Sequence, residues 1–123
     1  MTIGSNVTEI GAGAFSGCSK LKTVTVGSKV TKIDSNAFKG CTSLTKVTIP
    51  AKTTKIGANA FSGCKKIKTI TIKSTKLTDK SISKNAFKGL PKGTTIKVPK
   101  KKLSAYKNLF KKKGLSSKVK VTA

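Results

Sequence analysis

Apolar residues recur along this chain with a period of 23 residues, marked by Phe15, Phe38 and Phe61. Each Phe is preceded at five residues by Ile and followed at three by Cys, at six by Leu or Ile, and at nine and eleven by Val or Ile. One unit of this size cannot bury its apolar side alone, so a fixed period in the twenties predicts stacked coils. We therefore expect a solenoid in which equivalent residues lie over one another.

A fourth copy of the pattern contains Phe87, which follows Phe61 by 26 residues. The three additional residues fall within Lys73–Lys80. Insertions in solenoids map to surface loops, which tolerate extra length at little cost. We expect this segment to bulge outward, either as part of a binding face or as a neutral loop.

Within one coil, residues 23–26 alternate between Thr and Val. Alternation of β-branched and polar residues predicts a short strand with Val24 and Val26 inward. Equivalent strands should pair in parallel from coil to coil. In the next coil, Asp34–Gly40 offers polar cap residues, then Ala and Phe, then Gly, which predicts a short helical turn on the opposite side.

The last fifth of the chain, residues 100–123, has a different pattern. Leu103, Tyr106 and Phe110 stand at helical spacing, three lysines follow, and Gly114 suits a helix stop. An amphipathic basic helix can lie on an anionic membrane, but it can also cover the open end of a solenoid. We predict a capping helix, followed by a closing strand in residues 118–121. The predicted organisation is a solenoid over residues 1–99 and a cap over residues 100–123.

The chain begins inside a repeat, because Thr2–Val7 aligns with Thr25–Val30. Upstream sequence is therefore expected, including any signal peptide. The first coil should then expose apolar side chains and unpaired backbone groups, through which self-association is expected.

The charge is strongly one-sided: 27 basic residues, all Lys, stand against three acidic residues and give a formal net charge of +24. Lys is a mobile point charge that lacks the bidentate geometry of Arg. The lysines either keep the surface soluble or meet an anionic partner, and any contact with nucleic acid should be nonspecific. No apolar run is long enough to span a membrane.

The residue types needed for catalysis are scarce. His is absent, and Glu9, Asp34 and Asp79 occupy different positions in their coils, so no carboxylate pair is expected. We predict that the protein is not an enzyme and has neither a cofactor nor a metal site.

Three cysteines follow the repeat itself. Cys18, Cys41 and Cys64 are 23 residues apart and include no CxxC pair, and Leu90 takes the equivalent place in the fourth copy. We interpret them as small apolar core residues rather than as a metal or redox site.

The predicted strands place a row of polar side chains outward, and this row is the candidate binding face. Its members are Thr or Lys: Thr23, Thr25, Lys46, Thr48, Thr69, Thr71, Thr95 and Lys97, with Lys118 and Lys120 at the end. The alternative is that an outward Thr is simply a strand-forming polar residue.

The spacing of Ile, Phe, Cys, Leu and Val, taken with the recurring Gly, resembles the BspA-like leucine-rich repeats of bacterial surface proteins. The resemblance extends from Ile3 to Val98, although Lys29 stands where other leucine-rich repeats begin an Asn ladder. It implies a right-handed α/β solenoid with a parallel sheet lining its concave face, in an extracellular or cell-surface protein.

Members of this family are associated with adhesion, so the favoured function is a noncatalytic module that binds a host extracellular protein or an anionic glycan. Two alternatives stay open: a nonspecific binder of polyanions such as nucleic acid, teichoic acid or sulfated glycan, and a structural spacer.

Overall fold

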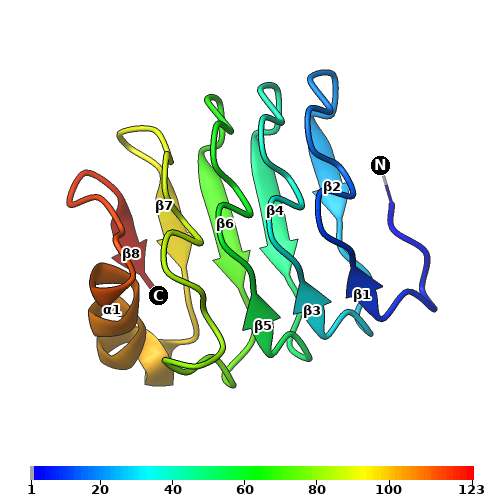
Figure 1. Cartoon of the computed structure of the whole chain (residues 1–123). Coiled ribbons are helices and arrows are strands. Elements are labelled where there is room, and N and C mark those ends of the chain that lie inside the picture. The colour runs from blue at the N-terminus through cyan, green and yellow to red at the C-terminus, as the bar shows by residue number, and fades with distance from the viewer. Residues whose placement is uncertain (1) are drawn as a thin grey trace.

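The computed structural model of the chain describes residues 2–123, which wind into stacked coils with a five-stranded parallel sheet along one side (Figure 1). In spatial order the strands are β2 (Thr23–Thr25), β4 (Lys46–Ile49), β6 (Thr69–Ile72), β7 (Thr95–Lys97) and β8 (Lys120–Thr122). This arrangement confirms the predicted α/β repeat solenoid.

Equivalent residues of successive coils are in register. Val24 pairs with Val47, Val47 with Ile70, and Ile70 with Ile96. These four side chains are at most 6% exposed, as the alternation of Val and Thr predicts. The last strand, β8, continues the same register and places Val121 beside Ile96.

A second, three-stranded parallel sheet was not predicted. It consists of β1 (Glu9–Ile10), β3 (Lys32–Ile33) and β5 (Lys55–Ile56), seen in front of the larger sheet in Figure 1. Each strand has two residues and contributes one buried Ile. A strand this short shows no alternation, so the Ile that precedes each Phe was recognised only as a core position.

The predicted short helical turns are wrong in detail: the segments around each Phe are consecutive turns without a helix. Asn36, Asn59 and Asn85 have φ angles of 60°, 57° and 66°, in the left-handed region that interrupts a helix. Alternate backbone amides there donate to the next coil instead of to the residue four positions back; for example, the Phe38 N–H donates to the Ala60 carbonyl at 2.8 Å. The amides between them close tight turns within the coil, as the Lys39 N–H does with the Asn36 carbonyl at 3.2 Å. Bonds between coils therefore replace helical bonds.

The phenylalanines form one continuous stack through the core. The ring centroids of Phe15 and Phe38 are 5.4 Å apart, those of Phe38 and Phe61 5.6 Å, and those of Phe61 and Phe87 6.0 Å, with the rings within 11° of parallel. Phe110 meets Phe87 edge-on at 5.0 Å. The stack confirms that like side chains lie directly over one another.

The C-terminal segment closes the solenoid with a 3-10 turn (η1, Lys100–Lys102) and one helix, α1 (Leu103–Lys112). Gly114 has a φ of 94°, and the Leu115 N–H donates to the Phe110 carbonyl, so the helix ends in the Gly stop that the sequence predicted. Tyr106 and Phe110 are buried in the same core as the coils. The boundary at residue 99 stays a prediction, since both sides of it share this core.

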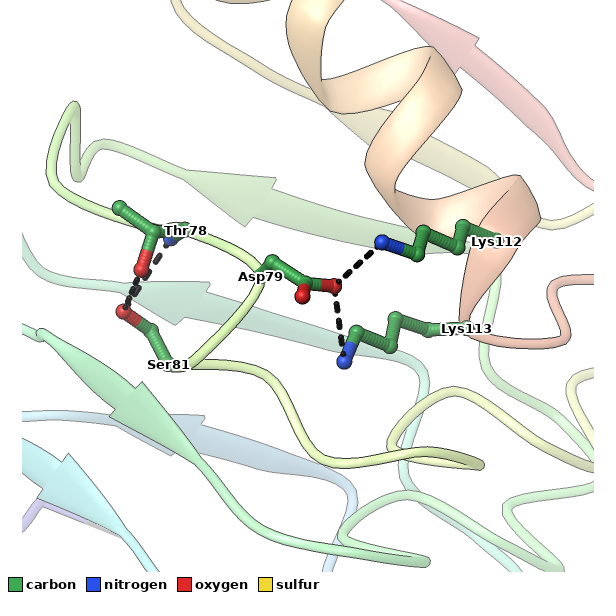
Figure 2. A network of polar contacts seen from close by, with 5 residues as sticks. All are labelled: Thr78, Asp79, Ser81, Lys112 and Lys113. Carbon is green, nitrogen blue, oxygen red and sulfur yellow. Dashed lines mark hydrogen bonds and ion pairs between the residues drawn. The ribbon is translucent and has the colours of Figure 1, made fainter.

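The insertion in Lys73–Lys80 does not simply bulge outward. Ser74 is fully buried and Leu77 is 5% exposed, because both are held against the helix by Tyr106. Figure 2 shows the exposed part of the loop, where Asp79 accepts contacts of 3.1 Å from both Lys112 and Lys113 at the end of α1. The extra residues therefore attach the cap to the coils.

The first coil is less covered than the coils that follow. Thr2 bridges to Thr25 and Ile3 is 8% exposed, so the N-terminal segment covers part of this end. Phe15, Cys18 and Leu21 are only partly buried, whereas their counterparts in the second coil are fully buried. Apolar surface is thus available at this end, as the sequence predicted.

Candidate functional site

The predicted site residues lie together on the outer face of the five-stranded sheet. Pairing in register gives two rows that cross all five strands. The first row is Thr23, Lys46, Thr69, Thr95 and Lys120, and the second is Thr25, Thr48, Thr71, Lys97 and Thr122. One terminal assignment was wrong: Lys118 precedes β8, and Thr122 takes the place beside Lys97.

A polar hollow of about 680 Å³ lies over β2, β4 and β6 on this face. Its polar lining consists of Thr23, Thr25, Lys46, Thr48, Thr71 and Lys73, and Val24, Val26 and Val47 complete the lining. Three predicted residues, Thr69, Thr95 and Lys97, are on the face but do not line this hollow. The hollow therefore covers only part of the predicted binding face and leaves the positions on β7 outside it.

Lys73 is a residue of this site that the sequence reasoning missed. It follows Thr69 and Thr71 in alternation, and its backbone N–H donates to the Ile49 carbonyl at 2.9 Å, which continues the ladder beyond β6. Lys73 also lines a neighbouring hollow of about 380 Å³ with Pro50 and Lys52. The period-two pattern could have revealed it, but assigning Lys73 to the insertion concealed the pattern.

The face is positively charged without compensation. Among residues 2–123, the ion pairs are Lys32 with Asp34, and Lys112 and Lys113 with Asp79, none of which lies on the outer face. Because the polar side chains that line the hollow carry hydroxyl and ammonium groups, they can donate hydrogen bonds to anionic or hydroxyl-rich ligands. It contains no base that would activate a nucleophile.

The cysteines form a column inside the solenoid. The thiol of Cys41 donates to the Phe15 carbonyl at 3.1 Å, and that of Cys64 to the Phe38 carbonyl at 3.2 Å. Burial raises the pKa of Cys41, and it raises the pKa of Cys64 to about 12, where the Coulomb effect of Cys41 acts in the same direction. These two thiols are core groups with little thiolate at neutral pH.

Two features are absent from the part of the chain that the structure describes. No group of three or more His, Cys, Asp or Glu side chains comes together there as a metal site would require. No helix within residues 2–123 combines the length and the apolar character needed to cross a bilayer.

Comparison with known families now identifies the repeat. The model of the BspA type leucine rich repeat region matches residues 1–116 in six copies. The chain belongs to this family. No curated protein and no solved structure matches the chain.

Membership in the family has consequences for function at a coarse level. Leucine-rich repeats of this type are protein-interaction or surface repeat modules, are generally noncatalytic and are typically surface-associated. A protein-interaction module binds through exposed surface, so the candidate binding sites of this chain lie on the exposed surfaces of the stacked coils.

Proposed function

We propose that this BspA-type repeat protein is a noncatalytic adhesion or ligand-binding module of the cell surface or extracellular space. Its binding face is the outer side of the five-stranded sheet, and its partner is an extracellular protein or an anionic glycan. The observation that supports this most directly is the polar, uncompensated hollow over β2, β4 and β6, which the register of the coils forms from Thr and Lys side chains.

The composition of this face predicts the character of the binding. Tight protein interfaces usually depend on Trp, Tyr or Arg anchors, and the two rows contain only Thr and Lys. Contacts between exposed charges are screened by salt. We therefore expect modest affinity for each copy, strengthened when several copies meet a repetitive ligand.

The net charge of +24 favours one second candidate, a nonspecific binder of polyanions. In that case affinity comes from release of counterions, and any polyanion of similar charge density binds alike. A third candidate, a spacer that displays another part of a longer protein, binds none of these ligands.

A binding series separates the three functions. The immobilised protein is offered fibrinogen, fibronectin, heparin and DNA over a range of salt concentrations. Affinity for one ligand that survives moderate salt supports the proposal. Equal, salt-labile affinity for all polyanions supports the second candidate, and absence of binding supports the third.

The location of the site is tested with a pair of charge-matched variants. Thr71→Glu with Lys97→Glu reverses charge on the sheet face, and Ser104→Glu with Lys107→Glu makes the same change in charge on the exposed surface of α1. Loss of binding in the first variant alone assigns the ligand to the sheet. Equal behaviour of the two variants removes the sheet face from consideration.

A further inference from the structure

Another hollow, of about 550 Å³, is lined mainly by the loops that precede β6 and β7. These loops lie at the top of Figure 1. This hollow shares no lining residue with the hollow on the sheet face. The first three coils carry Leu21, Leu44 and Ile67 at the sixth position after the Phe, where the fourth coil has Gly93. No atom lies within 4 Å of the place where a Cβ of Gly93 would be. The missing side chain therefore leaves space between the third and fourth coils.

The backbone keeps this space open. Gly93 has a φ of 89°, which side-chain-bearing residues rarely adopt, so the position is suited to Gly. The next residue, Thr94, is turned into the core, where its hydroxyl donates to the Ile67 carbonyl at 2.9 Å. The hydrogen bond holds the two loops at a fixed separation below the hollow.

Four lysines line the hollow, three from the third coil and one from the fourth: Lys65, Lys66, Lys68 and Lys92. All four are exposed, and none takes part in the ion pairs found among residues 2–123. The remaining lining is uncharged and includes Ile67, Pro91 and Thr45. Positive charges that line one hollow repel one another, and this repulsion is relieved when an anion binds among them.

The lining also discriminates between anionic ligands. Single-stranded nucleic acid is usually held by bases stacked on aromatic rings. In this protein Phe38, Phe61, Phe87, Tyr106 and Phe110 are buried, and no aromatic residue lines the hollow. The half-buried ring of Pro91 can instead meet the carbon face of a sugar ring, while the ammonium groups meet charged substituents around it.

We propose that this hollow, which we call the Gly93 notch, is a binding site for a sulfated glycan chain, with Lys65, Lys66, Lys68 and Lys92 holding sulfate groups and Pro91 supporting the sugar ring. The proposal is independent of the function assigned to the sheet face, because the two hollows have different residues and open at different places on the coils.

The first test uses ligands of matched length and measures affinity by calorimetry at two salt concentrations. The probes are a heparin hexasaccharide, the corresponding unsulfated oligosaccharide, a short polyphosphate and an oligothymidylate. We expect the sulfated sugar to bind most tightly. Equal affinity for oligothymidylate or polyphosphate, or undiminished affinity for the unsulfated sugar, would overturn the proposal.

The second test locates the site with three variants, each lacking two lysines. Lys66→Ala with Lys92→Ala changes the notch, Lys46→Ala with Lys97→Ala changes the sheet face, and Lys29→Ala with Lys101→Ala removes the same charge elsewhere. We expect the notch variant to lose about tenfold in affinity for the hexasaccharide, as for two partly exposed ion pairs. Its dependence on salt should also become shallower, by about one in the logarithmic slope for each lost contact.

Circular dichroism establishes that each variant is folded, so loss of affinity is not confused with unfolding. An equal loss of affinity in all three variants would mean that the net positive charge attracts the sugar without a defined site, and it would overturn the proposal. If the sheet variant alone lost affinity for the sugar, the ligand would belong to the sheet face and the proposal would also fail. If the notch variant alone lost affinity for the sugar, while binding of a protein ligand depended on Thr71 and Lys97, both proposals would stand.

Discussion

The Tyr106 hydroxyl donates a hydrogen bond of 2.8 Å to the backbone carbonyl of Ser74, 32 residues earlier in the chain. The same hydroxyl accepts a bond of 3.2 Å from the Leu77 N–H. One phenol thus satisfies two buried backbone groups of the inserted loop while its ring packs 5.5 Å from Phe110. The cap and the insertion form one structural unit through this side chain.

Tyr106→Phe removes the hydroxyl and leaves both backbone groups without this partner in a buried place. An unsatisfied buried polar group costs about 1–3 kcal/mol, so we expect the midpoint of thermal unfolding to fall by several degrees. Ser104→Ala, an exposed change on the same helix, is the control. A midpoint for Tyr106→Phe equal to that of the control would show that the bond contributes nothing to stability.

A second prediction concerns two glycines at equivalent positions in different coils. A Cβ on Gly57 would clash with the Ser35 nitrogen and would lie 2.6 Å from the Asp34 carbonyl carbon, both of which are backbone atoms that cannot easily move. Gly57→Ala should therefore force the coils apart and cost about 1–3 kcal/mol of unfolding free energy in urea titrations.

The control is Gly11→Ala, because Gly11 also stands four residues before its Phe and no atom lies within 4 Å of its added Cβ. This change should be neutral or slightly stabilising, since Ala restricts the unfolded chain. If the two variants were destabilised alike, the close approach of the second and third coils would not be the cause.

The sequence was sufficient to predict the structural features that recur in every coil. Phe15, Phe38 and Phe61 had to stack because a fixed period fixes which side chains meet, and alternation around Val24 fixed which ones face outward. The turns could not be predicted as well. A polar Asn before Ala-Phe is compatible with a helix cap, and only the contact with the next coil shows that Asn36 takes a left-handed conformation.

The candidate sites also differ in this respect: some of their features follow from the repeat, and others depend on contacts between neighbouring coils. The outward rows follow from one strand and one period, so their members were named correctly up to the last strand. A hollow depends on what two neighbouring coils leave unfilled, and the roles of Lys73 and Gly93 emerge only when those coils are placed side by side. Ser74 and Leu77 were expected outside because their partner, Tyr106, belongs to a segment with a different pattern.

Acid should weaken the attachment of the cap. The ammonium groups of Lys112 and Lys113 lower the pKa of Asp79 below its ordinary 3.8. Since the folded-state pKa is the lower one, the stabilisation is complete above the ordinary pKa and is lost as pH falls below about 4 through the folded-state value. Unfolding midpoints measured from pH 6 to pH 2 should therefore fall, and Asp79→Asn should flatten this fall.

Asp34 also makes the protein less stable in acid, because its pKa is lowered as well. The hydrogen bond from the Ser35 N–H is the main cause, and Lys32 acts in the same direction more weakly. Asp79→Asn alone should consequently leave part of the acid sensitivity in place. Glu9→Gln removes one negative charge from a residue outside the three ion pairs and serves as the control. An acid profile for Asp79→Asn identical to that of the control would refute the role of this carboxylate.

The cysteine column predicts unequal reactivity toward iodoacetamide at pH 8. Cys41 and Cys64 are fully buried with raised pKa values, whereas Cys18 is partly exposed in the first coil. Only the thiolate attacks the reagent, so the native protein should take up one equivalent rapidly, and mass spectrometry should locate it on Cys18. In urea all three should react. Rapid native labelling of Cys64 would mean that the third coil opens readily.

The partly covered first coil leads to the last prediction, self-association through that end of the solenoid. We propose that two copies meet there because Phe15, Cys18 and Leu21 retain exposed apolar surface, while α1 closes the opposite end. Two chains of charge +24 repel each other, and salt screens this repulsion while leaving the apolar contact intact. Sedimentation velocity should therefore show more dimer at high salt than at low salt, the opposite of the trend expected for binding to anions. Leu21→Lys should suppress the dimer, with Leu115→Lys at the other end as the control, and a strictly monomeric profile for the unaltered chain at high concentration and high salt would refute the contact.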